Sequence, residues 1–85
     1  MNFNLQIKFE DGTTHQVVGK AVDIVAFEQN FNMSMAALQK DTRMEHLFWL
    51  AWHVEKRTGQ TSAEFLKWLE TVEIVEASDP KASKA

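Results

Sequence analysis

The sequence predicts an α+β domain, in which an N-terminal β-hairpin packs on a small bundle of three to four helices. Two patterns lead to this prediction. The first ten residues alternate polar and apolar side chains and run into an Asp11-Gly12 turn, whereas residues 43–57 carry apolar side chains at helical spacing. No repeat or internal linker divides the 85 residues. We therefore expect a single domain over residues 1–77, followed by a disordered tail over residues 78–85.

The alternation of polar and apolar side chains, with a period of two residues, indicates the hairpin. Apolar residues occupy every second position of the first strand, namely Phe3, Leu5, Ile7 and Phe9. Asp-Gly is a strong turn signal, and the segment 13–18 after it is β-branched, as expected of a returning strand. Because an isolated hairpin is only marginally stable in water, we expect its apolar face to lie on helices.

Two short helices should follow the hairpin. Asp23 is placed to cap a helix over residues 24–31, and Ser34 is placed to cap a shorter turn over residues 35–39. A Thr-x-x-Glu pattern then begins at residues 42 and 61, and this pattern is the signature of a capping box. The two boxes predict the start of the long helix, which should end near Thr58-Gly59, and of a last helix over residues 62–71.

The segment 72–76, Val-Glu-Ile-Val-Glu, fits two structures. It either extends the last helix or forms a short strand. Beyond it, Pro80 and a run of small residues and lysines offer almost nothing to bury, which is why a disordered tail is expected there.

The long helix is apolar over an arc wider than the stripe that an ordinary surface helix buries. The arc comprises Met44, Leu47, Phe48, Ala51, Trp52 and Val54. The opposite side carries Glu45, His46, His53, Lys56 and Arg57, and Trp49 lies among them. We expect Trp52, together with Trp68 of the last helix, to be a core residue. Two interpretations of Trp49 stay open: it anchors a protein partner, with His46, His53 and Lys56 as a polar rim, or the hairpin or the tail covers it.

The composition excludes several classes of protein and site. The chain has no cysteine, so disulfides, a thiolate zinc site and a cysteine nucleophile are excluded, and a reducing cytoplasm is favoured. A net charge of −3 with scattered basic residues disfavours nucleic acid as a partner. The longest apolar run, residues 47–52, is far shorter than the ~20 residues of a membrane span, so no membrane association is expected.

Catalytic and metal chemistry are also disfavoured. His46 and His53 are seven residues apart, whereas metal-binding histidines on one helix are three or four apart. The serine and threonine hydroxyls at residues 34, 42, 61 and 62 are explained by helix capping, and no base accompanies them as a nucleophile requires. We expect a protein without enzymatic activity, metal or cofactor.

Glu28 is the acidic residue closest to an apolar face, between Ile24 and Phe31. It is either a buried carboxylate with a shifted pKa, which sometimes marks a functional site, or a rim group. A rim group, the commoner case, pairs with a base or caps a neighbouring helix end.

Three ordered segments carry a family resemblance. They are Phe-Glu-Gln-Asn-Phe at 27–31, Leu-Phe-Trp-Leu-Ala-Trp-His-Val-Glu-Lys-Arg-Thr-Gly at 47–59, and Glu-Phe-Leu-Lys-Trp-Leu-Glu-Thr-Val-Glu-Ile-Val-Glu at 64–76. Their order and spacing resemble the small tail assembly chaperones of long-tailed bacteriophages. The resemblance covers about two-thirds of the chain, and the motif residues are mostly structural.

The resemblance implies a non-enzymatic role in the host cytoplasm. Proteins of this family bind the long, helical tape measure protein and help recruit tail tube subunits around it. A bare apolar rod would aggregate, and a small protein with a hydrophobic groove can cover it. A homo-oligomer is compatible with this role. The alternative is a structural virion component, such as a head–tail connector protein, or a small regulatory adaptor.

Overall fold

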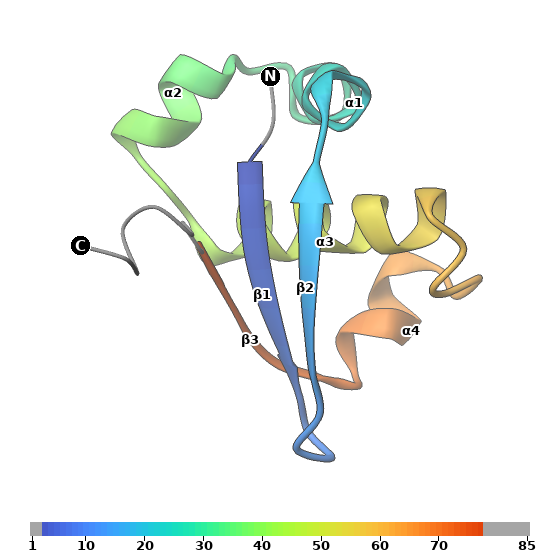
Figure 1. Ribbon diagram of the computed structural model, residues 1–85. Helices are drawn as coiled ribbons and strands as arrows, with labels where there is room; N and C mark the ends of the chain where they lie inside the picture. Colours follow the sequence, from blue (N-terminus) through green and yellow to red (C-terminus); the bar gives the residue numbers. More distant parts are fainter. Residues whose placement is uncertain (1–2, 78–85) are drawn as a thin grey trace.

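The computed structural model describes residues 3–77, so the predicted tail over 78–85 lies outside the described residues. Three strands and four helices follow one another along this part of the chain (Figure 1). They are β1 (Phe3–Phe9), β2 (Thr14–Gly19), α1 (Ala21–Phe31), α2 (Met35–Lys40), α3 (Met44–Arg57), α4 (Phe65–Leu69) and β3 (Val72–Ala77). The predicted α+β class, with an N-terminal hairpin and helices, is confirmed.

The sheet is antiparallel and has the order β2-β1-β3, so the first strand becomes the central one. Of the two structures that fit residues 72–76, the strand is the correct one. Val72 and Val75 are three residues apart, a helical spacing, yet both are buried. An irregularity in the register between Lys8 and Phe9 explains this, because a bulge shifts the alternation of a strand and lets both valines face the core.

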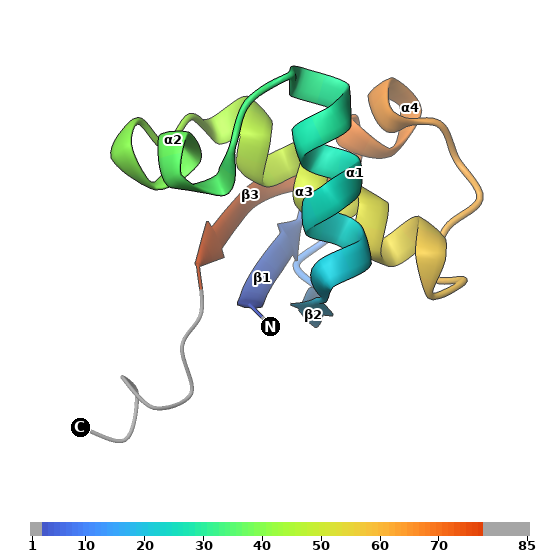
Figure 2. The same ribbon diagram turned by 90° about the horizontal axis from the view of Figure 1, so that it is seen from above.

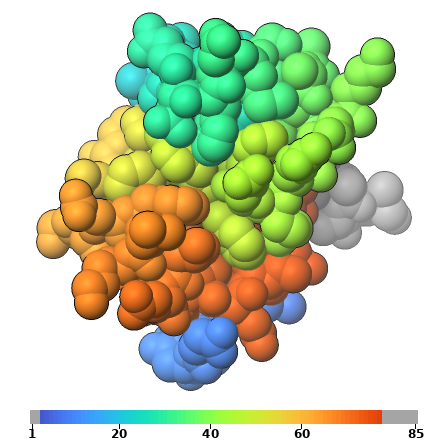
Figure 3. Space-filling model, turned by 180° about the vertical axis from the view of Figure 1, so that it is seen from behind, coloured from blue at the N-terminus to red at the C-terminus, as the bar shows by residue number. Residues whose placement is uncertain are grey.

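Helix α3 crosses one face of the sheet, and α1 starts at the end of β2 and runs across α3 beyond the end of the sheet (Figures 1 and 2). Seen from the helical side, α3 lies between α1 and α2 above it and α4 below it (Figure 3). The core between sheet and helices consists of Leu5, Ile7, Val17, Phe27, Leu38, Leu50, Ala51, Val54, Trp68, Val72 and Val75. The apolar face of the hairpin therefore packs on helices, as expected because an isolated hairpin is only marginally stable in water.

Two of the predicted helix ends are correct. The hydroxyl of Ser34 accepts a hydrogen bond of 3.1 Å from the backbone N–H of Ala37 at the start of α2. Helix α3 ends after Arg57, where Gly59 adopts a positive φ of 83°. The N–H of Gln60 then bonds the carbonyl of Glu55 at 2.8 Å, the pattern that satisfies the last carbonyls of a helix.

Both predicted capping boxes are wrong. The hydroxyl of Thr42 donates to the carbonyl of Leu38 in α2, and α3 starts only at Met44. The hydroxyl of Thr61 accepts from the N–H of Ala63, and α4 is confined to residues 65–69. In each case a hydroxyl that could cap the following helix instead satisfies a backbone group of the neighbouring turn, a local competition known for threonine.

The two tryptophans expected in the core differ. Trp68 is 3% exposed, as predicted. Trp52 is half-buried and only packs against the core, so the prediction that it is a core residue is wrong in part. Its ring contacts Phe65 edge-on and the ammonium group of Lys56, and its Nε1–H donates to the carbonyl of Ala63 at 2.9 Å. A polar partner at the ring edge keeps this tryptophan at the rim of the core.

Candidate functional site

A fully buried carboxylate, Asp23, joins α1 to the C-terminal end of α3. Arg57 donates to it through Nε at 2.9 Å and Nη2 at 2.8 Å, and Nδ1 of His53 lies 2.6 Å from its Oδ1. The backbone N–H of Lys20 completes the set at 2.8 Å. Asp23 was expected to precede its helix, but α1 begins at Ala21 and the carboxylate caps it from within the first turn.

The hydrogen bonds around Asp23 decide its charge state. Burial raises the pKa of this carboxyl, but the hydrogen bonds from Arg57, from the N–H of Lys20 and from His53 outweigh burial and lower the pKa below its ordinary value. The same hydrogen bond to Asp23 raises the pKa of Arg57. The pair is therefore ionised, and the two hydrogen bonds from Arg57 to a buried carboxylate fix how the two helices meet.

The predicted partner face is mostly occupied within the chain itself. His46 was expected on an exposed polar side of the long helix, and this is wrong: it is 7% exposed, because α1 covers that side. Its ring meets Phe27 and Phe31 edge-on at 5.4 and 4.8 Å.

The other three residues of that face differ in exposure. Trp49 is half-buried against Phe31 of α1, with ring centroids 5.6 Å apart, and the tail that was the other candidate cover lies outside the described residues. His53 is half-buried, stacks on Trp49 at 5.1 Å and holds Asp23, whereas Lys56 is exposed. Partner binding by these residues stays a prediction, and His46 could take part only if α1 left α3.

A second buried carboxylate joins α3 to the sheet. Glu55 is 2% exposed, and its Oε2 lies 3.2 Å from Nδ1 of His15 on β2. The two residues are 40 positions apart in the sequence. Glu28, by contrast, is half-buried, and its Oε2 accepts the N–H of Met35 at 3.1 Å. Its interpretation as a group that caps a neighbouring helix end is confirmed.

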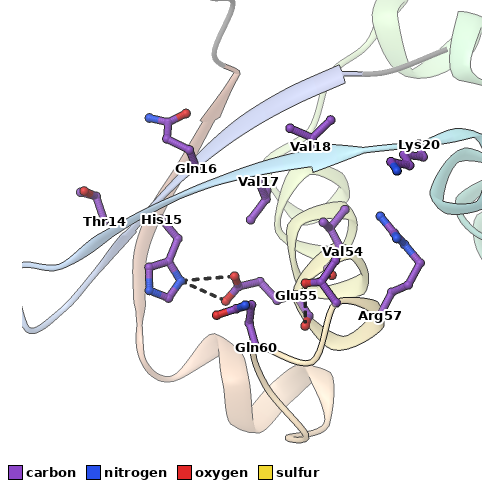
Figure 4. A pocket seen from close by; sticks show the side chains of 11 residues that line it. Thr14, His15, Gln16, Val17, Val18, Lys20, Val54, Glu55, Arg57 and Gln60 are labelled. Atoms are coloured by element: carbon purple, nitrogen blue, oxygen red, sulfur yellow. Dashed lines mark hydrogen bonds and ion pairs between the residues drawn. The ribbon is translucent and has the colours of Figure 1, made fainter.

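An open groove of about 530 Å³ runs between β2 and the C-terminal end of α3 (Figure 4). One side consists of strand residues and the other of residues from the end of α3 and the loop after it. The lining comprises Thr14, His15, Gln16, Val17, Val18, Lys20, Val54, Glu55, Arg57, Thr58 and Gln60. The His15–Glu55 pair bridges its two sides (Figure 4).

A smaller and more apolar groove, of about 190 Å³, lies at the other end of α3. It is formed between α2, the start of α3 and the sheet. Its lining comprises Phe3, Asn4, Leu5, Met35, Leu38, Gln39, Thr42, Leu47, Leu50 and Ala77. Leucine side chains dominate its walls, and the flexible side chain of Met35 can adapt to an apolar partner.

Neither groove assembles the groups of a metal site. Over residues 3–77, no three histidine, cysteine, aspartate or glutamate side chains are grouped to hold an ion. The hydroxyl of Thr58, which lines the larger groove, bonds the carbonyl of Val54 at 2.8 Å. The arrangement offers hydrogen-bonding strand backbone and apolar walls, which suit the binding of polypeptide.

Sequence reasoning missed both buried carboxylates. One signal pointed to Asp23: His53 and Arg57 are four residues apart, so they lie on one face of α3 and can share a partner. No comparable signal points to the pairing of His15 with Glu55, because strand and helix register are both needed to bring them together.

No family model, no curated protein and no solved structure matches this chain. Over the described residues, the helices are too short or too polar to cross a bilayer.

Proposed function

We propose that this protein is a tail assembly chaperone of a long-tailed bacteriophage, which binds the helical tape measure protein and helps recruit tail tube subunits. The observation that carries the proposal is the order of the three motifs over residues 27–31, 47–59 and 64–76. A protein-binding role of this kind needs no catalytic group, and it operates in the host cytoplasm, where the tail is assembled.

The way in which the three motifs pack supports the proposal. Phe31 of the first motif meets Trp49 of the second at 5.6 Å between ring centroids. Trp52 of the second motif meets Phe65 of the third at 5.7 Å. The aromatic residues that carry the resemblance thus contact one another, so the resemblance concerns one connected structural unit.

The apolar groove beside α2 is the binding site that we propose for the tape measure protein. Its occupant would be one amphipathic helix of that protein, whose apolar face buries against Met35, Leu38 and Leu47. Met44, 42% exposed at the start of α3, would extend the contact. A long helical protein that presents such faces repeatedly would be kept from aggregation by many copies of a small chaperone.

Co-expression tests the proposal. The partner is the large tail protein encoded beside this chain in its phage genome, and the measurement is the soluble fraction of that protein. The wild-type chain should make it soluble, whereas Met35→Lys should not, because the substitution puts a charge in the groove. Leu66→Lys is the matched control, since Leu66 is 72% exposed on α4 and lines neither groove.

A large tail protein that stays insoluble with the wild-type chain would refute the function. Loss of solubilisation by Leu66→Lys but not by Met35→Lys would refute the site.

A further inference from the structure

The two edges of the sheet differ in a way that points to a second binding site. Strand β2 forms one edge and β3 the other. The β3 edge carries Glu73 and Glu76, and charges on an edge strand discourage another strand from pairing there. The β2 edge, residues 14–19, has no charged residue and no proline.

The backbone of β2 has hydrogen-bonding groups free at this edge. The N–H of Phe9 bonds the carbonyl of Thr13 at the hairpin end, and the antiparallel ladder alternates from there. The backbone groups of His15 and Val17 therefore face β1, whereas those of Thr14, Gln16 and Val18 point outward. Within residues 3–77, no other strand pairs along this edge.

The free edge also forms one wall of the larger groove. Val18, 43% exposed, provides apolar surface there, and the end of α3 with Thr58 and Gln60 forms the opposite wall. A sheet edge beside a helix is the arrangement in which an extended peptide adds as a further strand while its alternate side chains enter the groove.

The shape of the β2 edge favours the binding of a single extended segment over edge-to-edge pairing with a second copy of this chain. The last turns of α3 extend past β2 on the helical side of the sheet (Figure 1). Two copies that paired edge to edge about a two-fold axis would both bring this overhang into the same space. One extended segment, with no helical layer attached at its free side, fits beneath it.

The charges of the groove indicate the chemistry of that segment. Glu55 is buried against His15, and Arg57 is bound to Asp23. Lys20 is exposed at the end of β2 and makes no ion pair within the described residues. The groove is therefore left with a positive charge at this end, which an acidic side chain would complement.

We propose that the edge of β2 binds an extended protein segment of alternating β-branched residues with an acidic residue next to Lys20. This site is separate from the apolar groove beside α2, and the inference does not depend on the proposed function. Affinity comes from hydrogen bonds to the backbone groups of residues 14, 16 and 18, and the preference for an acidic residue comes from Lys20.

The test uses the full chain and two synthetic peptides, observed by amide NMR. Each peptide alternates valine and threonine over the length of β2, with a glutamate at both ends in one and a lysine at both ends in the other. At millimolar concentration the glutamate peptide should shift the amides of Thr14, Gln16 and Val18 and slow their hydrogen exchange. It should bind about threefold more tightly than the lysine peptide, as expected of one exposed ion pair.

Two variants make the test specific. Gln16→Pro removes an outward N–H without touching the ladder to β1, and should abolish binding. Gln16→Val, its matched control, keeps the N–H and should bind as the wild type does. Lys20→Glu should reverse the preference between the two peptides, and it serves as the decisive variant if Gln16→Pro does not fold.

Absence of shifts at residues 14, 16 and 18 with the glutamate peptide overturns the proposal. So does unchanged binding by folded Gln16→Pro, or a peptide preference that Lys20→Glu leaves as it was.

Discussion

The two ends of α3 are held in place by different forces. Its C-terminal end is fixed by two buried carboxylates, because Glu55 meets His15 on the sheet and Asp23 of α1 meets Arg57. Among the described residues, its N-terminal half is held mainly by apolar and aromatic contacts, through Leu47, Leu50 and the buried ring of His46, beside an apolar groove.

This difference suggests that the C-terminal end of α3 fixes the geometry of the fold, whereas the N-terminal end can adapt to different neighbours. A carboxylate that is buried away from water is costly unless its hydrogen-bonding partners are in the right place. The charged end of α3 therefore admits one arrangement of helix and sheet. The apolar end can repack around different side chains at small cost, which is what a surface that accommodates another protein requires.

The largest expected effect comes from the charged end. Asp23→Ala removes a buried carboxylate that accepts hydrogen bonds from Arg57 and from the N–H of Lys20, and it should lower the free energy of unfolding by about 3 kcal/mol in urea denaturation. Glu28→Ala is the matched control: that half-buried carboxylate accepts one backbone N–H, and its loss should cost about 1 kcal/mol. Equal losses for the two variants would remove the distinction between the ends of the helix.

The same carboxylate predicts how stability depends on pH. The pKa of Asp23 in the folded protein lies below its ordinary value of 3.8. Its contribution to stability is therefore complete above about pH 3.8, the unfolded value, and is lost as the pH falls through the lower folded pKa. In acid titrations of urea unfolding, the wild type should lose stability more steeply below that pH than Asp23→Asn, which lacks the titrating group. Parallel curves would contradict the assignment.

Trp49 lies at the boundary between the two ends. Trp49→Ala removes ring contacts to Phe31 and His53, and it should lower the free energy of unfolding by about 2 kcal/mol, less than the loss for a fully buried tryptophan. Leu66→Ala, at a position that is 72% exposed, should change stability by less than about 0.5 kcal/mol. Unchanged stability with lost partner binding would instead support the sequence-based partner face around Trp49.

Substitutions of Gly59 test how much the turn after α3 contributes to stability. Its φ of 83° is strained for any residue with a Cβ, so Gly59→Ala should cost about 1 kcal/mol and lower the Tm by about 4–8 °C. Gly59→Asn should cost less, because asparagine tolerates this conformation better than alanine does. A calorimetric scan in which alanine and asparagine behave alike would speak against strain at this turn.

The smallest effect is expected at the apolar end. Leu47→Met conserves volume in a half-buried wall of the groove, so the free energy of unfolding should change by less than about 1 kcal/mol. Urea denaturation that shows a loss comparable to that of Asp23→Ala would mean that this end is as rigidly specified as the other.

Local periodicity predicted most of the elements, because it depends on residues close in the chain. The hairpin followed from alternation in residues 3–9, and the end of α3 from Gly59. The third strand stayed ambiguous, because a bulge gives its buried valines a helical spacing. The capping boxes failed because Thr42 and Thr61 had alternative partners within reach.

The site was harder to predict, because it depends on residues distant in the chain. Asp23 reaches Arg57 across 34 positions and Glu55 reaches His15 across 40. A polar face on a helix looks the same in the sequence whether it meets solvent or another helix. His46 and His53 were therefore assigned to the surface although α1 lies over them.

The placement of β1 between β2 and β3 bears on how the chain folds during synthesis. The central strand precedes both of its neighbours in the chain, and one of them, residues 72–77, is separated from it by β2 and the four helices. A nascent chain therefore carries an open edge on β1 until Ala77 has left the ribosome, and the long sequence separation makes this pairing a slow one. During that interval the partly folded chain is exposed to strand addition by other nascent chains.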